Sequence, residues 1–120
     1  MTVHPLQDEL VRAAPTPTFV AFTRLRADGD VEVVLRGALD AATLPVLSAI
    51  LDSVQRMDAS HVCLDLFGVT SWSLLVEGAV LSTARRLEAS GNHLFLTAPG
   101  EELRRQGSRL DLFSRIPLQT

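Results

Sequence analysis

The spacing of apolar residues near the start of the chain predicts a β-hairpin. Apolar and β-branched residues dominate positions 19–25, and apolar residues alternate with other side chains over 31–35. Asp and Gly residues at 27–30 separate the two stretches and favour a tight turn. Two strands joined by such a turn form an antiparallel pair. The Gly-Ala-Leu-Asp sequence at 37–40 predicts that the second strand ends there and that a helix follows.

The next apolar residues recur at spacings of three and four, which places them on one face of a helix. They are Leu44, Leu47, Leu51 and Val54. Pro45 suits the first turn of this helix, where a missing N–H costs little, and Asp40 or Thr43 is the expected N-cap residue. The Asp-Ala-Ser sequence at 58–60 predicts its end.

The remaining elements alternate between strand and helix. A continuous apolar run at 61–66 predicts a central strand that is covered on both faces. Residues 74–89 predict a helix, followed by a strand over 93–97 and a third helix over 101–110. The helix over 74–89 has an apolar stripe of Val76, Val80, Ala84 and Leu87, with Glu77, Arg85 and Glu88 outside it. The apolar tail at 112–116 predicts either an edge strand or a cap.

This order of elements, β-β-α-β-α-β-α, indicates an α/β protein. Each later strand follows a helix, so right-handed crossovers pair these strands in parallel. The hairpin adds an antiparallel edge. The predicted fold is therefore a mixed β-sheet with helices packed against it.

Size and composition indicate one domain inside the cell. The chain has 120 residues, of which 47% are hydrophobic, and no apolar run approaches the roughly 18 residues of a membrane span. Residues 1–17 predict an N-terminal arm, either loosely ordered or with a helical turn near 6–11, and residues 18–118 predict the domain. The arm lacks the pattern of a secretion signal, which indicates a cytoplasmic protein. A net charge of −3 argues against nucleic-acid binding.

The sequence holds no persuasive active site. His61 and His93 open two strands that are expected to be neighbours, but no further ligand stands at metal-binding spacing, so we expect no metal. The single Cys63 lies in an apolar strand, where a buried thiol is the expected state. Asp65 closes that strand, and we expect it to bond loop N–H groups. We therefore expect neither catalysis nor a cofactor.

The junction at 67–75 predicts a turn between a buried strand and the start of a helix. It contains Ser71, Trp72 and Ser73, and no charged residue occurs over 66–76. The first turn of a helix has free N–H groups, and the preceding strand would hold it rigidly. Such a junction is typical of a regulated contact surface. Trp72 is interpreted either as a core residue or as an exposed interface anchor.

Two segments resemble the STAS domain, the family of anti-sigma factor antagonists and related modules. Residues 35–45, LRGALDAATLP, are similar to the family's G-x-L/I-D-x-x-T/S segment. Residues 62–70, VCLDLFGVT, are similar to its apolar strand ending in D-L-S-G-V-T. The following helix and strand and the LDLF sequence at 110–113 also fit, so the resemblance covers about residues 18–118. It implies a STAS-like fold and a partner that is both an anti-sigma factor and a serine kinase.

The chain departs from the family pattern where the family carries its phosphorylated serine, at the start of the second helix. In that family, phosphorylation of this serine adds negative charge and weakens binding to the partner. An alignment without a gap places Ser73 on the family's aspartate and Leu74, which has no hydroxyl, on its phosphoserine. We favour this alignment because it keeps the phase of the helix stripe, and it makes Ser73 a helix N-cap. A one-residue deletion would instead make Ser73 the phosphorylation site and place Trp72 on the aspartate.

The resemblance implies a protein-binding regulator that sequesters an anti-sigma factor without the usual phosphoserine switch. The implied partner-binding residues are Asp40, Ala41, Thr43, Ser71, Trp72, Ser73, Leu74 and Leu75. The alternative is an accessory subunit of a transporter ATPase or of a stress-sensing assembly, bound to a constitutive partner. A small-ligand sensor rests on family analogy alone. An exposed apolar helix start is also compatible with a homodimer.

Overall fold

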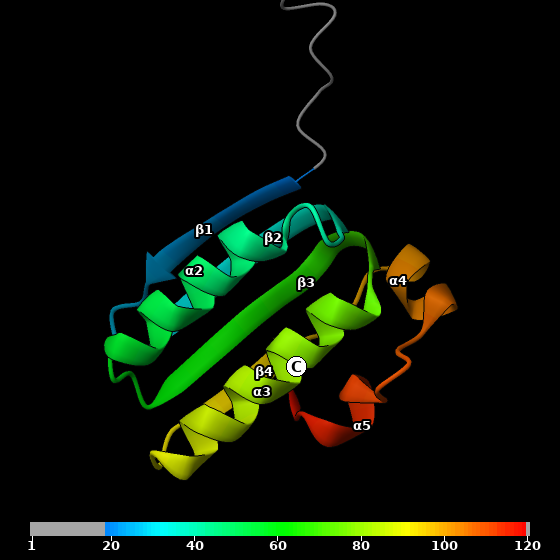
Figure 1. Ribbon diagram of the computed structural model, residues 1–120. Helices are drawn as coiled ribbons and strands as arrows, with labels where there is room; N and C mark the ends of the chain where they lie inside the picture. Colours follow the sequence, from blue (N-terminus) through cyan, green and yellow to red (C-terminus); the bar gives the residue numbers. More distant parts are fainter. Residues whose placement is uncertain (1–18, 120) are drawn as a thin grey trace, which may run out of the picture.

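The computed structural model describes residues 19–119, and the predicted mixed α/β fold is confirmed (Figure 1). In chain order the elements are β1 Phe19–Leu25, β2 Val31–Leu39, α2 Leu44–Arg56, β3 His61–Trp72, α3 Leu74–Ala89, β4 His93–Thr97, α4 Glu101–Gln106, α5 Leu112–Arg115 and β5 Leu118–Gln119. The predicted N-terminal arm lies outside the described residues. None of the described helices is long and apolar enough to cross a membrane.

The five strands form one sheet in the order β1-β2-β3-β4-β5. β1 and β2 are antiparallel, and the other three pairs of neighbours are parallel. The β1–β2 turn passes through Gly29 at a φ of +87°, and the Asp30 N–H donates to Asp28 Oδ1 at 3.0 Å. The predicted hairpin and the central place of the strand that begins at His61 are both confirmed.

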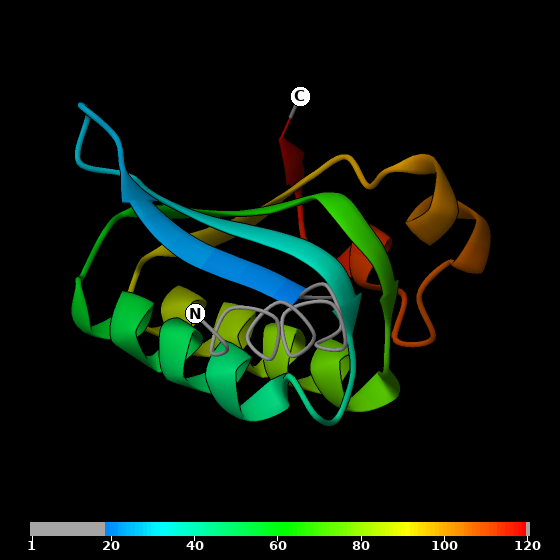
Figure 2. The ribbon, with the colours of Figure 1, turned by 90° about the horizontal axis from the view of Figure 1, so that it is seen from above.

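Helices α2 and α3 cover one face of the sheet, as Figure 2 shows. The predicted stripe of α2 is confirmed, because Leu47, Leu51 and Val54 are buried and Leu44 packs against the core in part. Core residues on the sheet include Val33, Leu35, Val62, Leu64, Leu66, Leu94 and Leu96, and those on α3 include Val76, Val80 and Leu87. Each large apolar side chain buried in this way stabilises the fold by about 1.5–3 kcal/mol.

Strands β2 and β3 both run further than the sequence predicts. The second strand, predicted over 31–35, continues through Gly37 and Ala38 and ends at Leu39, and the turn expected after residue 66 is wrong because β3 continues to Trp72. Gly37 pairs with Val69 and Leu39 pairs with Trp72, so the two strands supply each other with hydrogen-bonding partners that local sequence does not reveal. Gly37 has a φ of +97° beside a shift in register, and it therefore allows an irregularity inside the strand instead of ending it.

The C-terminal elements also differ from the prediction. The helix expected over 101–110 ends at Gln106, because Gly107 adopts a φ of +74° that does not continue a helix. The tail at 112–116 forms α5 and buries Leu112 and Ile116, so it acts as a cap. The edge strand begins only at Leu118, where β5 pairs with β4.

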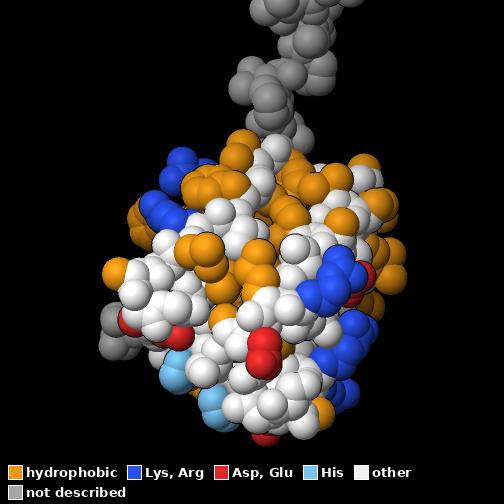
Figure 3. All heavy atoms as spheres, turned by 90° about the vertical axis from the view of Figure 1, so that its left-hand side faces the viewer, with side chains coloured by type: hydrophobic (Ala, Val, Ile, Leu, Met, Phe, Trp, Pro, Cys, Tyr) orange, Lys and Arg blue, Asp and Glu red, His pale blue; other side chains and the backbone are white. Residues whose placement is uncertain are grey.

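The alternation of buried and exposed side chains that the pattern at 31–35 predicts is wrong, because all five residues are buried. Val34 and Glu32 point away from α2 and α3, yet only 1% and 8% of their surfaces are exposed. Phe22 on β1 is the cross-strand neighbour of Val34. At the β1 edge, Val20 and Phe22 are 42% and 41% exposed, and hydrophobic side chains are visible there in Figure 3.

Candidate partner-binding site

The two segments that resemble the STAS domain meet at one end of the sheet. β2 and β3 are parallel neighbours, and Leu39 at the end of β2 pairs with Trp72 at the end of β3. The Ser73 N–H donates to the Leu39 carbonyl at 2.9 Å, which fixes the start of α3 beside the β2–α2 loop. Figures 1 and 2 both show this loop and the first turn of α3 at the same end of the molecule.

The β2–α2 loop is held by hydrogen bonds between Asp40 and Thr43. Asp40 Oδ1 accepts the Ala42 and Thr43 N–H groups at 3.0 and 3.1 Å, and Thr43 Oγ1 accepts the Asp40 N–H at 2.9 Å. Of the two expected N-cap residues, Asp40 and Thr43, it is Thr43 that stands at the N-cap position of α2. Its side chain makes no capping hydrogen bond to that helix. Asp40 and Ala41 are exposed, and Thr43 is half-buried.

Ser73 caps helix α3, as the alignment without a gap predicts. Its backbone is extended, and its Oγ accepts the Val76 N–H at 3.3 Å. Leu74 and Leu75 follow in the first turn and are 45% and 60% exposed. Two neighbouring leucines therefore face solvent on the first turn of α3. Ser71, at the end of β3, is half-buried.

Trp72 packs inward. Its indole N–H donates to the Gly107 carbonyl at 3.2 Å, and its ring stacks on Phe113 with centroids 5.4 Å apart. The side chain is half-buried and belongs to the hydrophobic groups that pack against the core. These contacts agree with the interpretation of Trp72 as a core residue and not as an exposed interface anchor.

Sequence reasoning missed one residue at this end of the molecule. Glu77 was expected outside the buried stripe of α3, and that expectation is wrong, since only 2% of its surface is exposed. Its partners are groups at residues 108–110, far along the chain, and no local pattern points to them. Arg85 and Glu88 are exposed as predicted.

The other candidate groups lie on the sheet away from α2 and α3. His61 and His93 pair across β3 and β4, with ring centroids 6.2 Å apart, as their positions predict. Within residues 19–119 no group of three or more side chains is arranged to hold a metal ion. Asp65 was expected to bond loop N–H groups, but its Oδ1 accepts the N–H of Phe67 at 3.0 Å, a residue inside β3. Burial raises the pKa of the Cys63 thiol, against the opposing effect of Arg26.

Comparison with known families decides the relationship. The sequence profile described as "STAS domain" matches residues 23–120, which is most of the chain. The chain belongs to the STAS domain family. Comparison with curated protein sequences gave no significant match.

Solved structures with this STAS fold include several anti-sigma factor antagonists. One, from Mycobacterium paratuberculosis, is 21% identical with a TM-score of 0.74, and the match covers 88% of this chain and 89% of that one. The unphosphorylated form of the anti-sigma factor antagonist SpoIIAA is 17% identical with a TM-score of 0.65, covering 84% and 88% of the two chains. SpoIIAA in its phosphorylated form, described as a Bacillus cell fate determinant, is 20% identical with a TM-score of 0.62, covering 84% and 92%.

Proposed function

We propose that this STAS domain is a protein-binding regulator of the anti-sigma factor antagonist type. In this role it sequesters an anti-sigma factor that is also a serine kinase, and it does so by binding and not by catalysis. The resemblance at 35–45 and 62–70 and the fold shared with solved antagonists support the proposal.

The observation that carries the proposal is the pair of exposed leucines on the first turn of α3. Leu74 and Leu75 stand beside the exposed Asp40 and Ala41 of the β2–α2 loop. Apolar side chains on a rigid helix end, next to a loop held by its own hydrogen bonds, make a preformed surface that loses little entropy on binding. Ser71, Trp72 and Ser73 shape this surface from beneath.

In this proposal the domain does not alternate between the phosphorylated and unphosphorylated states that are usual in the family. Leu74 has no hydroxyl, and the Ser73 hydroxyl already accepts a hydrogen bond as the cap of α3. A phosphate on the serine would place nearly two negative charges beside two leucines of the surface. We expect a constitutive complex whose formation ATP does not reverse.

The test is a pull-down with the full chain from the source cell's extract, with and without ATP, followed by mass analysis of the captured proteins and of the domain itself. Capture of an anti-sigma kinase together with an unmodified domain supports the proposal. A phosphate on Ser73 contradicts the constitutive mode and favours the gapped alignment.

The absence of a hydroxyl at Leu74 is also compatible with a second function. A STAS domain that is never phosphorylated would suit an accessory subunit of a transporter ATPase or of a stress-sensing assembly. Capture of only an ATPase of a transporter, or of other STAS proteins, would replace the anti-sigma role with this one.

A further inference from the structure

The segment between α4 and α5 is tied closely to the end of β3. Gln106 Nε2 donates to the Thr70 carbonyl at 2.7 Å, and the Trp72 indole N–H donates to the Gly107 carbonyl. These bonds join residues about 35 positions apart in sequence, so they hold 106–107 against the junction that leads into α3.

Glu77 holds the next part of this segment from the α3 side. Its buried carboxylate accepts the Ser108 hydroxyl at one oxygen, and also the Arg109 and Leu110 N–H groups, each at 3.2 Å. No cation among residues 19–119 forms an ion pair with it. The charge of a buried carboxylate is costly unless hydrogen bonds satisfy it, and here three donors from one segment do so. The first turn of a helix also favours a negative charge.

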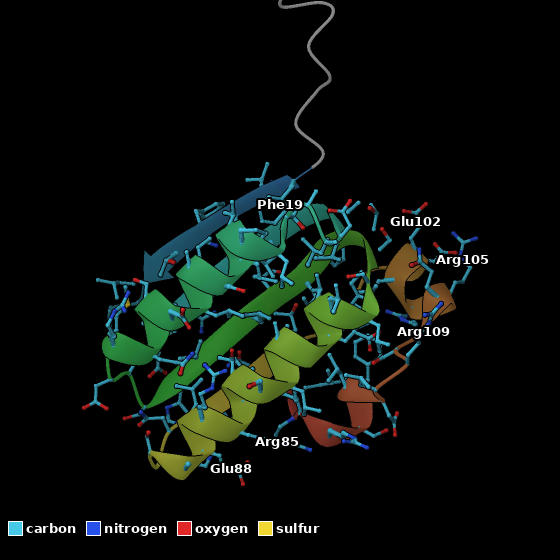
Figure 4. The ribbon with its side chains drawn as sticks, in the orientation of Figure 1. Phe19, Arg85, Glu88, Glu102, Arg105 and Arg109 are labelled. Atoms are coloured by element: carbon cyan, nitrogen blue, oxygen red, sulfur yellow. The ribbon has the colours of Figure 1, made fainter. Side chains whose placement is uncertain are left out.

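These contacts place the positively charged side chain of Arg109 beside the first turn of α3. A pocket of about 450 Å³ lies between the start of α3 and the segment 106–110. Ser73 and Leu74 line it on the α3 side, and Gln106, Gly107 and Arg109 line it on the other. The Arg109 backbone is fixed by Glu77, but its side chain is exposed and forms no ion pair with any described residue. Figure 4 shows Arg109 near the start of α3, and Arg85 toward the other end of that helix.

We propose that Glu77 positions residues 106–110 as the second half of the partner-binding surface, and that Arg109 there contacts an acidic side chain of the partner. This inference rests on the proposed function, because the partner is the same one. Leu74 and Leu75 provide apolar contact but no charge. An exposed, unpaired guanidinium at the rim supplies the electrostatic complementarity that selects a partner and steers its approach.

The positioning role of Glu77 is tested on the protein alone. Trp72 is the only tryptophan of the chain and is bonded to the segment in question, so its fluorescence reports the position of that segment. In Glu77→Gln the amide nitrogen cannot accept an N–H. We expect a red-shifted Trp72 emission and faster hydrogen exchange at the Arg109 and Leu110 amides, with the far-UV circular dichroism retained.

Two further variants keep this test decisive. Glu88→Gln, on the exposed surface of the same helix, is the matched control and should change neither signal. If Glu77→Gln does not fold, Ser108→Ala removes one of the three donors to Glu77, together with the hydroxyl that accepts the Leu112 N–H at 2.9 Å, and should shift both signals in the same direction. Emission and exchange identical to the unmodified protein in the folded variant would overturn the positioning role.

The contact made by Arg109 is tested by calorimetry with the captured anti-sigma kinase. Reversal of the charge in Arg109→Glu replaces an attraction by a repulsion, so we expect the Kd to rise about tenfold, with a weaker dependence on salt. Arg85→Glu, an exposed arginine elsewhere on α3, should leave the Kd unchanged.

The outcomes separate this inference from the function on which it rests. If Leu74→Asp prevents binding while Arg109→Glu binds normally, the proposed function stands and the contact made by Arg109 is overturned. If the unmodified domain binds no anti-sigma kinase, the proposed function and the Arg109 contact fall together, and the Trp72 measurements still decide the role of Glu77.

Discussion

At the scale of single residues, the start of α3 combines a structural serine with two exposed leucines. The extended backbone of Ser73 allows its hydroxyl to accept the Val76 N–H, which is one of the free donors of the first turn. The side chain is thus explained by the stability of the helix, whereas the exposure of Leu74 and Leu75 is not. This contrast separates Ser73, which stabilises the helix, from the two leucines that we propose to contact a partner.

Replacing the Ser73 hydroxyl should cost stability. We expect Ser73→Ala to lower the free energy of unfolding by about 1 kcal/mol in urea titrations, because the Val76 N–H loses its acceptor. Ser73→Asp also caps helices and should keep most of the stability. Ser114→Ala, at an exposed position in α5, is the control. Equal losses in Ser73→Ala and Ser73→Asp would show that the cap is not the cause.

Cys63 should be unreactive in the folded protein. It is 5% exposed, and burial raises the pKa of its thiol, so little thiolate forms near neutral pH. We expect slow alkylation by iodoacetamide at pH 7.5 and rapid alkylation after unfolding in urea, measured by intact mass. Equally fast labelling in both states would contradict the described burial.

At the scale of elements, the β1–β2 hairpin is joined by ion pairs on one face. Arg24 Nη2 and Arg26 Nη2 lie 2.6 and 2.9 Å from the two carboxylate oxygens of Glu32. Burial alone would raise the pKa of Glu32, but the hydrogen bonds from Arg26 and Arg24 outweigh it and hold the pKa below its ordinary value. The hairpin was predictable from its turn, while this pairing depends on the register of the two strands.

The lowered pKa predicts how the contribution of Glu32 depends on pH. The unfolded chain takes up a proton first as the pH falls, so the stabilisation is complete above the unfolded pKa of about 4.3 and is lost as the pH falls through the lower folded value. Urea titrations of the unmodified protein and of Glu32→Gln should differ most near pH 7 and converge in acid. A difference that stays constant down to strong acid would be inconsistent with this account.

The ends of strands and helices were less predictable than their existence. The apolar period of α2 and the central place of the strand that begins at His61 were both confirmed, because each depends on burial within one element. The expected cover on both faces of that strand was not, since α2 and α3 lie on one face and His61 is exposed. The extension of β2 from the predicted 31–35 to Leu39, and of β3 to Trp72, depends on pairing between the two strands, which carries β2 through Gly37 and Ala38. Local sequence cannot show a hydrogen-bonding partner from another strand.

At the scale of the whole molecule, the candidate site depends on contacts between distant parts of the chain. The resemblance located the β2–α2 loop and the start of α3, and the structure brings them together through the pairing of Leu39 with Trp72. It could not locate the buried Glu77, because the donors that satisfy its carboxylate come 31 to 33 residues later. A charged residue next to an apolar stripe looks exposed until its partners are known.

The packing of Trp72 affects the choice of variants for binding studies. Trp72→Ala would remove the stack on Phe113 and the bond to Gly107, so we expect a loss of about 3 kcal/mol or more in stability. Thermal unfolding measures this directly, and an unchanged midpoint would contradict the described packing. Weaker binding by that variant would not distinguish a lost contact from a disturbed fold.

The most direct test of the central claim is a calorimetric titration of the anti-sigma kinase with Leu74→Asp. The matched control is Leu25→Asp, because Leu25 is also exposed, at 70%, but lies at the hairpin turn toward the opposite end of the sheet. Both variants should remain folded, since each changes an exposed leucine. The account predicts that Leu74→Asp abolishes detectable binding and that Leu25→Asp binds like the unmodified domain. Equal affinity of the two variants would contradict the claim that the first turn of α3 binds the partner.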